Sequence, residues 1–366
     1  MNTTIERRRT LVKSCYIHIP FCKKICTYCD FCKFFYNEEW VSKYLLSLEN
    51  EINSKYKGEI LDTLYIGGGT PSSLDIKSLE DLLKISRIFK LNDNYEYTIE
   101  FNPEDINEDK LSLCKEYGVN RISIGIESFN KDNLKYLGRD YFDFKSKMKL
   151  VKKYFDNINV DLIYGLSIED LDILNKDIDN ILELDVPHIS CYSLIIEDHT
   201  VLNNKGTKEI SEDLDYDMYK LINSKLKDYN HYEISNYAKE GYESKHNLTY
   251  WNNEEYYGFG VGAASYIGNK RILNSKDILS YMNKEYKTFE EELTLEDKIS
   301  YELILGFRKI KGINVDKFYK KYNKDLLSLY NIKDLLEEKK LIIKEGYIFI
   351  NDQYLYIENE ILSNFV

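Results

Sequence analysis

Cysteines are the residues of this chain whose type and spacing point most clearly to chemistry. Four of its seven cysteines, Cys22, Cys26, Cys29 and Cys32, lie within eleven residues. In a reducing cytosol such crowding is more typical of metal binding than of disulfides. The first three are separated by three and then two residues, which differs from the paired C-x2-C spacing of structural zinc sites. Three thiolates on one short loop suit a cubane iron–sulfur cluster with one iron left open to a small chelating ligand. A zinc site that takes Cys32 as its fourth ligand is the alternative.

Three further features could contribute to a binding site. Residues 67–69 are consecutive glycines followed by Thr70, and they predict either a tight turn or a close approach of backbone to a ligand. Glu100 and Glu127 each stand at the end of an apolar run. Asp161 lies inside an apolar run, where a buried carboxylate needs polar partners.

Six short β-rich segments position these residues. They are residues 15–19, 63–66, 95–101, 121–126, 159–164 and 188–194. Segments with helical spacing lie between them, and alternating βα units predict a parallel sheet with right-handed crossovers. Because eight units close a full barrel, six predict an open, partial TIM-like barrel of the α/β class. The cysteines, the glycines, Glu100 and Glu127 follow four successive strands, so they are expected to form one pocket at the carboxyl edge of the sheet.

Two stretches resemble a known family. Residues 16–22 (YIHIPFC) and 26–31 (CTYCDF) are similar to the radical S-adenosylmethionine (radical SAM) enzymes, within the oxygen-independent coproporphyrinogen III oxidase-like branch. More narrowly they resemble the HemW-type haem chaperones of that branch, and the similarity runs from about Tyr16 to the C-terminus. The resemblance implies a [4Fe-4S] cluster on Cys22, Cys26 and Cys29, with S-adenosylmethionine at the open iron. Cys32 has no counterpart in this pattern.

The resemblance also implies cofactor contacts, although it assigns no catalytic residue. The candidates for S-adenosylmethionine binding are Tyr16, Tyr28, Gly68, Gly69, Thr70, Glu100, Glu127, Arg139 and Asp161. Arg139 offers a fork of donors that suits a carboxylate. Glu127 stands where relatives usually carry Gln, so a donor role cannot be copied to it directly.

A second motif, HNLTYW at residues 246–251, matches a signature of the HemW-like proteins. Its haem-binding candidates are His246, Asn247, Tyr250 and Trp251. Imidazole is a competent axial ligand for haem iron, and aromatic rings can pack against a flat macrocycle. The alternative is that His246 closes the core over the cofactor.

Three domains are expected along the chain. Residues 1–200 form the barrel with the cluster, 201–290 an extension with the HNxxYW motif, and 291–366 a winged-helix-like module of three helices and a hairpin.

The resemblance implies a haem chaperone that delivers haem to a respiratory haem protein and takes electrons from a donor such as flavodoxin or ferredoxin. The alternative is an oxygen-independent coproporphyrinogen III dehydrogenase, which converts propionates to vinyl groups by radical oxidative decarboxylation. The net charge of −12 gives no electrostatic footprint for nucleic acid. The chain has no run of about 18 apolar residues, so no transmembrane segment is expected. The start is basic but lacks an apolar core, so a cytoplasmic location is expected.

Overall fold

The centre of the fold is a curved sheet of parallel strands. The computed structural model describes residues 12–365. The basic start, from which a cytoplasmic location is expected, therefore lies largely outside the described residues. All six predicted β segments are strands: β1 (Ser14–Ile19), β4 (Ile60–Gly68), β5 (Lys90–Phe101), β6 (Arg121–Glu127), β7 (Asn157–Tyr164) and β8 (His188–Ser193). They are neighbours in this order, and each adjacent pair is parallel. The predicted partial barrel of six βα units is therefore confirmed.

The sheet continues beyond these six strands at both edges. Next to β1 lies β11 (Tyr256–Phe259), which is also parallel to it, followed by antiparallel β12 (Ala264–Ile267), β13 (Lys270–Asn274) and β14 (Lys287–Glu292). Next to β8 lie β10 (Asn236–Ala238) and β9 (Asn230–Glu233), both in antiparallel pairs. The segment after the barrel thus completes the sheet rather than standing apart from it.

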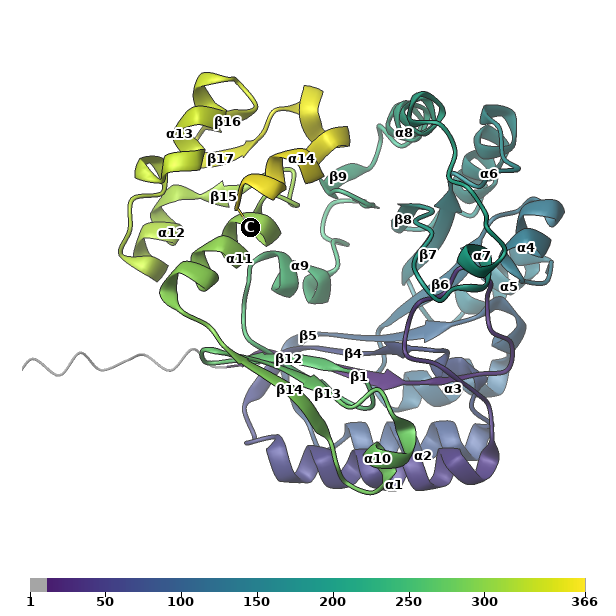
Figure 1. Cartoon of the computed structure of the whole chain (residues 1–366). Helices are drawn as coiled ribbons and strands as arrows, with labels where there is room; N and C mark the ends of the chain where they lie inside the picture. Colours follow the sequence, from purple (N-terminus) through teal and green to yellow (C-terminus); the bar gives the residue numbers. More distant parts are fainter. Residues whose placement is uncertain (1–11, 366) are drawn as a thin grey trace, which may run out of the picture.

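Helices cover the outer face of the sheet, and Figure 1 shows α1 and α2 lying along it. They are α1 (Glu38–Lys55), α2 (Ile76–Ser86), α3 (Glu108–Glu116), α4 (Lys131–Leu137), α5 (Phe144–Val151), α6 (Leu171–Glu183) and α8 (Glu212–Lys225). In α1 the buried residues Tyr44, Leu48 and Ile52 repeat at the spacing of one helical face. Shorter elements are β2 (Phe21–Cys22), β3 (Phe34–Phe35), α7 (Val201–Asn204) and α10 (Ile278–Met282).

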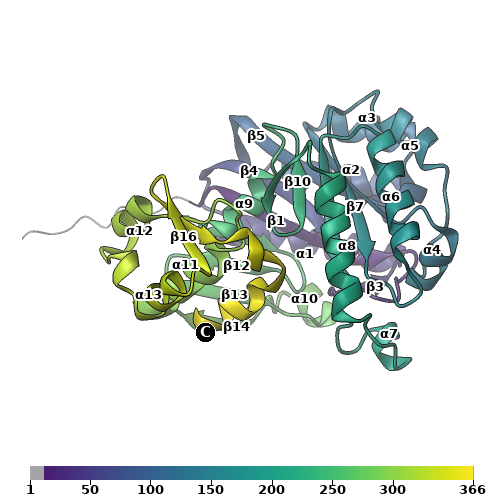
Figure 2. The same cartoon turned by 90° about the horizontal axis from the view of Figure 1, so that it is seen from above.

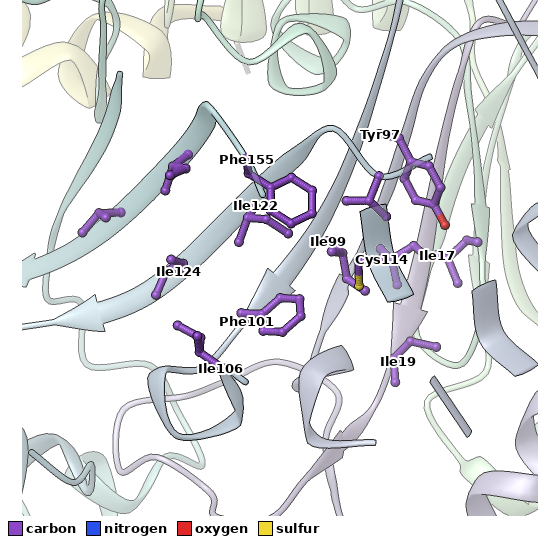
Figure 3. Close-up of a cluster of buried hydrophobic side chains, with 14 of the residues drawn as sticks. Ile17, Ile19, Tyr97, Ile99, Phe101, Ile106, Cys114, Ile122, Ile124 and Phe155 are labelled. Atoms are coloured by element: carbon purple, nitrogen blue, oxygen red, sulfur yellow. The ribbon is translucent and has the colours of Figure 1, made fainter. Parts of the chain in front are cut away.

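The strands alternate between an apolar outer face and a polar inner face. Ile99 and Phe101 of β5 lie beside Ile122 of β6 in the core between sheet and helices, where Cys114 of α3 joins them (Figure 3). Cys15 and Cys191 are also buried in this core. The residues between these point inward, and they are polar on every central strand. A closed TIM barrel fills its interior with branched apolar side chains, so this interior is built to hold a ligand.

A short helix, α9 (Lys245–Trp251), packs against β1 and β4, and Figure 2 shows it beside β1. The carboxylate of Glu96, from β5, accepts hydrogen bonds from the backbone nitrogens of Lys245 and His246, both at 3.0 Å. Ser244 caps the same end through the nitrogen of Asn247. A carboxylate at a helix N-terminus satisfies free N–H groups and complements the helix dipole. Glu96 therefore fixes α9 across the end of the barrel where the parallel strands begin, which we call the floor.

The C-terminal residues form a module with a hydrophobic core of its own, built around residues such as Phe307, Phe318 and Ile332. Its elements are α11 (Leu295–Gly306), β15 (Ile313–Asn314), α12 (Val315–Tyr322), α13 (Tyr330–Glu337), β16 (Leu341–Lys344), β17 (Tyr347–Ile350) and α14 (Glu358–Leu362). The predicted hairpin is β16–β17, and positive φ at Glu345 and Gly346 gives it a primed two-residue turn. Among residues 12–365, no helix is long and apolar enough to cross a bilayer.

Candidate functional site

A cavity of about 470 Å³ opens at the carboxyl edge of the parallel strands. Most of the predicted site residues line it together: Cys22, Cys26, Tyr28, Cys29, Gly68, Gly69, Thr70, Glu100, Glu127, Arg139, Asp161 and Asn247. Tyr16, His246, Tyr250 and Trp251 are not part of this lining. The structure therefore brings the cysteine loop, the glycine loop and the acidic strand ends into one site.

Backbone hydrogen bonds hold the cysteine loop against the barrel. The nitrogen of Thr27 donates to the carbonyl of Leu137 at 3.0 Å, and its hydroxyl donates to the carbonyl of Tyr136 at 2.8 Å. At the other end of the loop, the nitrogen of Tyr36 donates to the carbonyl of Cys22 at 2.9 Å. The loop is thus tied both to α4 and to its own short strand pair.

Two of the three thiols receive hydrogen bonds from donors in the cavity wall. The hydroxyl of Thr70 donates to Sγ of Cys22 at 3.6 Å, and Nη1 of Arg139 donates to Sγ of Cys26 at 3.4 Å. Burial raises the pKa of Cys22 to about 11 and also raises the pKa of Cys29. Metal binding requires thiolates and so releases their protons. Hydrogen-bond donors and a guanidinium beside the thiols favour that deprotonated, metal-bound form.

Cys32 is directed away from the other three cysteines. Its Sγ lies 3.6 Å from the carbonyl oxygen of Lys276, next to Gly262, and it does not line the cavity. Among residues 12–365, no three His, Cys, Asp or Glu side chains converge as the ligands of a single ion do. A cubane cluster holds each cysteine through a different iron, so its ligands need not converge. The donor set of three thiols fits such a cluster with one iron left open.

The glycine loop packs tightly against its neighbours in the chain. A Cβ at Gly67 would lie 2.6 Å from the carboxylate of Glu100, and one at Gly69 would lie 2.7 Å from the backbone of Pro20. Gly68 has a φ of 119°, and a Cβ there would lie 2.6 Å from the ring of His18. These contacts show a tight packing of the loop against the chain itself, and its approach to a ligand stays a prediction. Its backbone reaches the cavity because no side chain stands in between.

Glu127 and Arg139 form a nearly buried pair on the opposite wall. Nη1 of Arg139 lies 3.7 Å from Oε1 of Glu127, and its Nη2 donates to the carbonyl of Gly125 and to Oδ1 of Asn102. Glu127 adopts a left-handed backbone (φ 67°) at a bulge between β6 and β7, a conformation that costs energy in a residue with a side chain. The bulge re-aims the strand end so that this carboxyl faces the cavity.

Comparisons with known proteins agree with this geometry. The model of the radical SAM superfamily matches residues 16–179. The haem chaperone HemW of Lactococcus lactis is 39% identical, covering 96% of this chain and 97% of its own. HemW of Bacillus subtilis is 40% identical over 97% of this chain and 99% of its own length. The chain belongs to the HemW family. This confirms the predicted family and, with it, the predicted radical SAM superfamily. Membership of that superfamily implies an iron–sulfur cluster and S-adenosylmethionine.

A solved structure supports the fold of this HemW-family chain. The coproporphyrinogen III oxidase HemN of Escherichia coli superposes with a TM-score of 0.84, covering 97% of this chain and 90% of its own. The two sequences are 22% identical, so the likeness concerns the fold alone. The predicted radical SAM fold is confirmed over nearly the whole chain.

The motif histidine of the HemW-family chain lies in the floor of the barrel. His246 is 1% exposed, with Nδ1 2.8 Å from the hydroxyl of Thr63 and Nε2 2.8 Å from the hydroxyl of Tyr250. Its ring stacks on Tyr65 at 5.1 Å between centroids. Burial lowers the pKa of His246 to about 3, so the ring is neutral and both nitrogens are occupied. This geometry favours the alternative role, in which His246 closes the core, over that of a haem ligand.

Apart from Tyr28, the other aromatic candidates of the two motifs do not line the cavity. Trp251 stacks against the guanidinium of Arg308 at 5.0 Å, toward the C-terminal module. The hydroxyl of Tyr16 lies 3.0 Å from Nδ1 of His18, and its ring centroid lies 6.4 Å from that of His246. Asn247 alone of the HNxxYW residues reaches the cavity lining.

Several cavity residues were not singled out from the sequence. They are Asn102, Arg121, Ser123, Asn159, Ser190, Tyr192 and Ile195. The available signal was the alternation of polar residues within apolar strands, as in Arg121 and Ser123 of β6. That pattern indicates an inward face, but it does not say that the inward face surrounds a cavity.

Replacing Glu127 by Gln is expected to change how stability depends on pH. Burial raises the pKa of Glu127 from its ordinary 4.5 to about 7, against the opposing charge of Arg139. The folded protein therefore keeps this proton at a pH where the unfolded chain loses it, and stability falls as pH rises from about 4.5 to 7. Glu127→Gln removes this loss, so its stability relative to the wild type should rise over that window by up to about 3 kcal/mol.

Denaturant unfolding across this pH range measures the difference. The exposed Glu240 provides a matched control, because Glu240→Gln changes a solvated carboxyl. A difference between Glu127→Gln and wild type that stays constant with pH would show that Glu127 is already ionised in the acidic range.

Proposed function

We propose that this chain is a haem chaperone, which binds haem at the mouth of a radical SAM site and passes it to a respiratory haem protein. The support is its membership of the HemW family and one feature of the cavity. Phe31 and Ile195, which are 63% and 64% exposed, stand in the lining of the cavity, together with Tyr192. Exposed apolar side chains gathered at the mouth of a cavity suit contact with a flat apolar ligand.

The chain's own residues would hold the cofactors of this proposal as follows. Cys22, Cys26 and Cys29 would bind a [4Fe-4S] cluster, and the glycine loop with Glu100 and Arg139 would orient S-adenosylmethionine beside it. When bound, the cluster supplies a single electron that can cleave the sulfonium of S-adenosylmethionine. The protein excludes water and fixes geometry, whereas the cofactors supply the reactive chemistry. We further propose a cytoplasmic location and a flavodoxin- or ferredoxin-type electron donor.

Removing the apolar side chain of Phe31 is expected to weaken haem binding. Phe31→Ser should raise the haem Kd about tenfold, because burying an aromatic side chain against a ligand contributes a few kcal/mol at most. Absorbance titration of cluster-loaded protein with haem measures this affinity. Phe35→Ser is the matched control, because Phe35 is 66% exposed and lies outside the cavity lining.

One assay separates the chaperone from the oxidase. Anaerobic protein with cluster, S-adenosylmethionine and reductant is given coproporphyrinogen III, and mass spectrometry follows 5′-deoxyadenosine and decarboxylated porphyrinogen. We expect no porphyrin product, and we expect the same protein loaded with haem to transfer it to an apo haem protein. Stoichiometric decarboxylation would make the chain an oxidase, and equal haem affinity in Phe31→Ser and Phe35→Ser would remove the proposed haem site.

A further inference from the structure

One buried cation in the cavity, Arg121, has no hydrogen-bond partner for its side chain among the described residues, although its charge acts on Asp161. Arg121, on β6, is 2% exposed and lines the cavity. Among residues 12–365, no hydrogen bond or ion pair to its guanidinium is found, and its buried Nε has no partner. A guanidinium keeps its charge and presents five N–H donors in a fixed fork. Burying such a group without partners is costly unless a ligand supplies them.

The other groups of the cavity are already engaged. The carboxylate of Asp161 accepts from Asn159 at 2.8 Å and from Ser123 at 3.3 Å, and it forms no ion pair with Arg121. The carboxylate of Glu100 accepts from the hydroxyl of Tyr65 at 2.8 Å and from the nitrogen of Gly68 at 3.0 Å. Glu100 and Asp161 are therefore held by neutral donors, while the guanidinium of Arg121 donates no hydrogen bond to either carboxylate.

Arg139, by contrast, has hydrogen-bond and ion-pair partners for its guanidinium in the same cavity. It contacts Glu127, Asn102, the carbonyl of Gly125 and the thiol of Cys26, so it belongs to the level of the cysteine loop. Arg121 precedes Gly125 by four residues on the same strand, which places its backbone about 13 Å further from the carboxyl edge. The two arginines therefore lie at different depths of one cavity.

The two buried histidines on the barrel floor do not provide a negatively charged partner for Arg121. His246 and His188 are buried, with their ring nitrogens bonded to Thr63 and Tyr250, and to Asn159 and Tyr232, respectively. Burial lowers the pKa of both, and the charge of Arg121 contributes in the same direction. Both rings are neutral, and neither offers Arg121 a negative partner.

We propose that Arg121 binds a carboxylate at the end of a side chain of the porphyrin-class ligand, with that side chain extending from the cavity mouth toward the floor. This inference rests on the proposed function, since it assigns a contact to the ligand of the same site. A planar fork of donors matches a carboxylate in two parallel hydrogen bonds. Asn159, Ser190 and Asn247 supply neutral polar groups to the same cavity, and Asp161 also lines it but forms no ion pair with Arg121.

The test compares haemin with haemin dimethyl ester, in which both carboxylates are masked. Cluster-loaded wild type should bind the free acid about tenfold more tightly than the ester, because a hydrogen bond to a charged group contributes about that factor. Arg121→Gln should bind the two equally. Arg271→Gln is the matched control, because Arg271 pairs with Asn253 and two tyrosines outside the cavity and should keep the preference. If Arg121→Gln does not fold, Arg121→Lys keeps the charge without the fork and should show a smaller preference than wild type.

The carboxylate of S-adenosylmethionine is the other possible source, and a second ligand pair distinguishes it. Arg121→Gln should bind both S-adenosylmethionine and its decarboxylated analogue as the wild type does. An unchanged preference for the free acid in the variant, or a loss confined to the S-adenosylmethionine pair, would overturn the inference. If the wild type binds haemin and its dimethyl ester equally, the inference is overturned and the proposed function stays intact. A wild type that binds neither form would overturn both.

Discussion

Replacing Cys29 by alanine is expected to leave the protein with almost no iron–sulfur cluster after anaerobic reconstitution. The cavity offers three thiols, and a cubane that keeps one iron open for a ligand needs all three. Cys32 cannot replace the missing ligand without moving, because its thiol lies against the carbonyl of Lys276 and outside the cavity. Affinity for S-adenosylmethionine should fall with the cluster, since its anchoring iron is lost.

Iron and sulfide content, the visible absorbance of the cluster and its electron paramagnetic resonance after reduction measure the effect. Cys32→Ala is the matched control within the same loop, and it should load a full cluster. The opposite pattern, with a full cluster in Cys29→Ala and none in Cys32→Ala, would make Cys32 the third ligand and require the loop to refold around it.

The sequence was informative about the barrel because each central strand alternates strongly between two environments. Apolar residues such as Ile99 and Ile122 face the helices, and polar ones such as Glu100 face the interior. A period of two with β-branched residues predicts strands whatever their neighbours are. The cysteine spacing was equally local, since a cluster needs ligands close together on one loop.

The added edge strands were harder to predict. Strands β9 to β12 have three or four residues each, too few for a clear alternation. They are strands because β1 and β8 leave open edges that they cover. The position of α9 depends on Glu96, which precedes it by about 150 residues and caps its N-terminus through space. Contacts of this kind cannot be read from a local pattern.

The partners of the polar residues inside the barrel were equally hard to predict from the sequence. Arg121 looks in the sequence like an ordinary strand residue, and it could equally have paired with the polar residues of the neighbouring strand β7, such as Asp161. Whether an inward guanidinium is satisfied depends on distances across several strands, and here Asp161 is engaged by neutral neighbours instead. The sequence indicated which residues face inward, whereas the structure indicates which of them still lack a partner.

His246 shows how a motif can be recognised correctly while its role depends on contacts. The HNxxYW string identifies the family, and an isolated imidazole could bind iron. In the structure the ring spans Thr63 and Tyr250 beneath Tyr65, with no nitrogen free. Binding haem iron would break one of these hydrogen bonds and expose a floor residue that Glu96 and α9 hold in place.

We therefore expect His246→Ala to act mainly on stability. The substitution leaves two buried hydroxyls without their partner and opens a cavity under Tyr65, which together should cost roughly 3–5 kcal/mol of the free energy of unfolding. That is a large share of the 5–15 kcal/mol typical of a folded domain. Haem affinity per folded molecule should change by less than about threefold, under 0.7 kcal/mol. Denaturant unfolding and haem titration at a temperature where the variant stays folded measure the two quantities separately.

His199→Asn provides the control, because His199 is exposed and asparagine tolerates its left-handed backbone (φ 67°). It should change neither stability nor haem affinity. If His246→Ala instead proved as stable as the wild type but lost haem binding, the floor would have to open during loading, with His246 released from Thr63 or Tyr250 to reach the iron. The stability of the floor and the affinity for haem would then be opposed, because each hydrogen bond that holds the ring in place would be one that ligand binding must break.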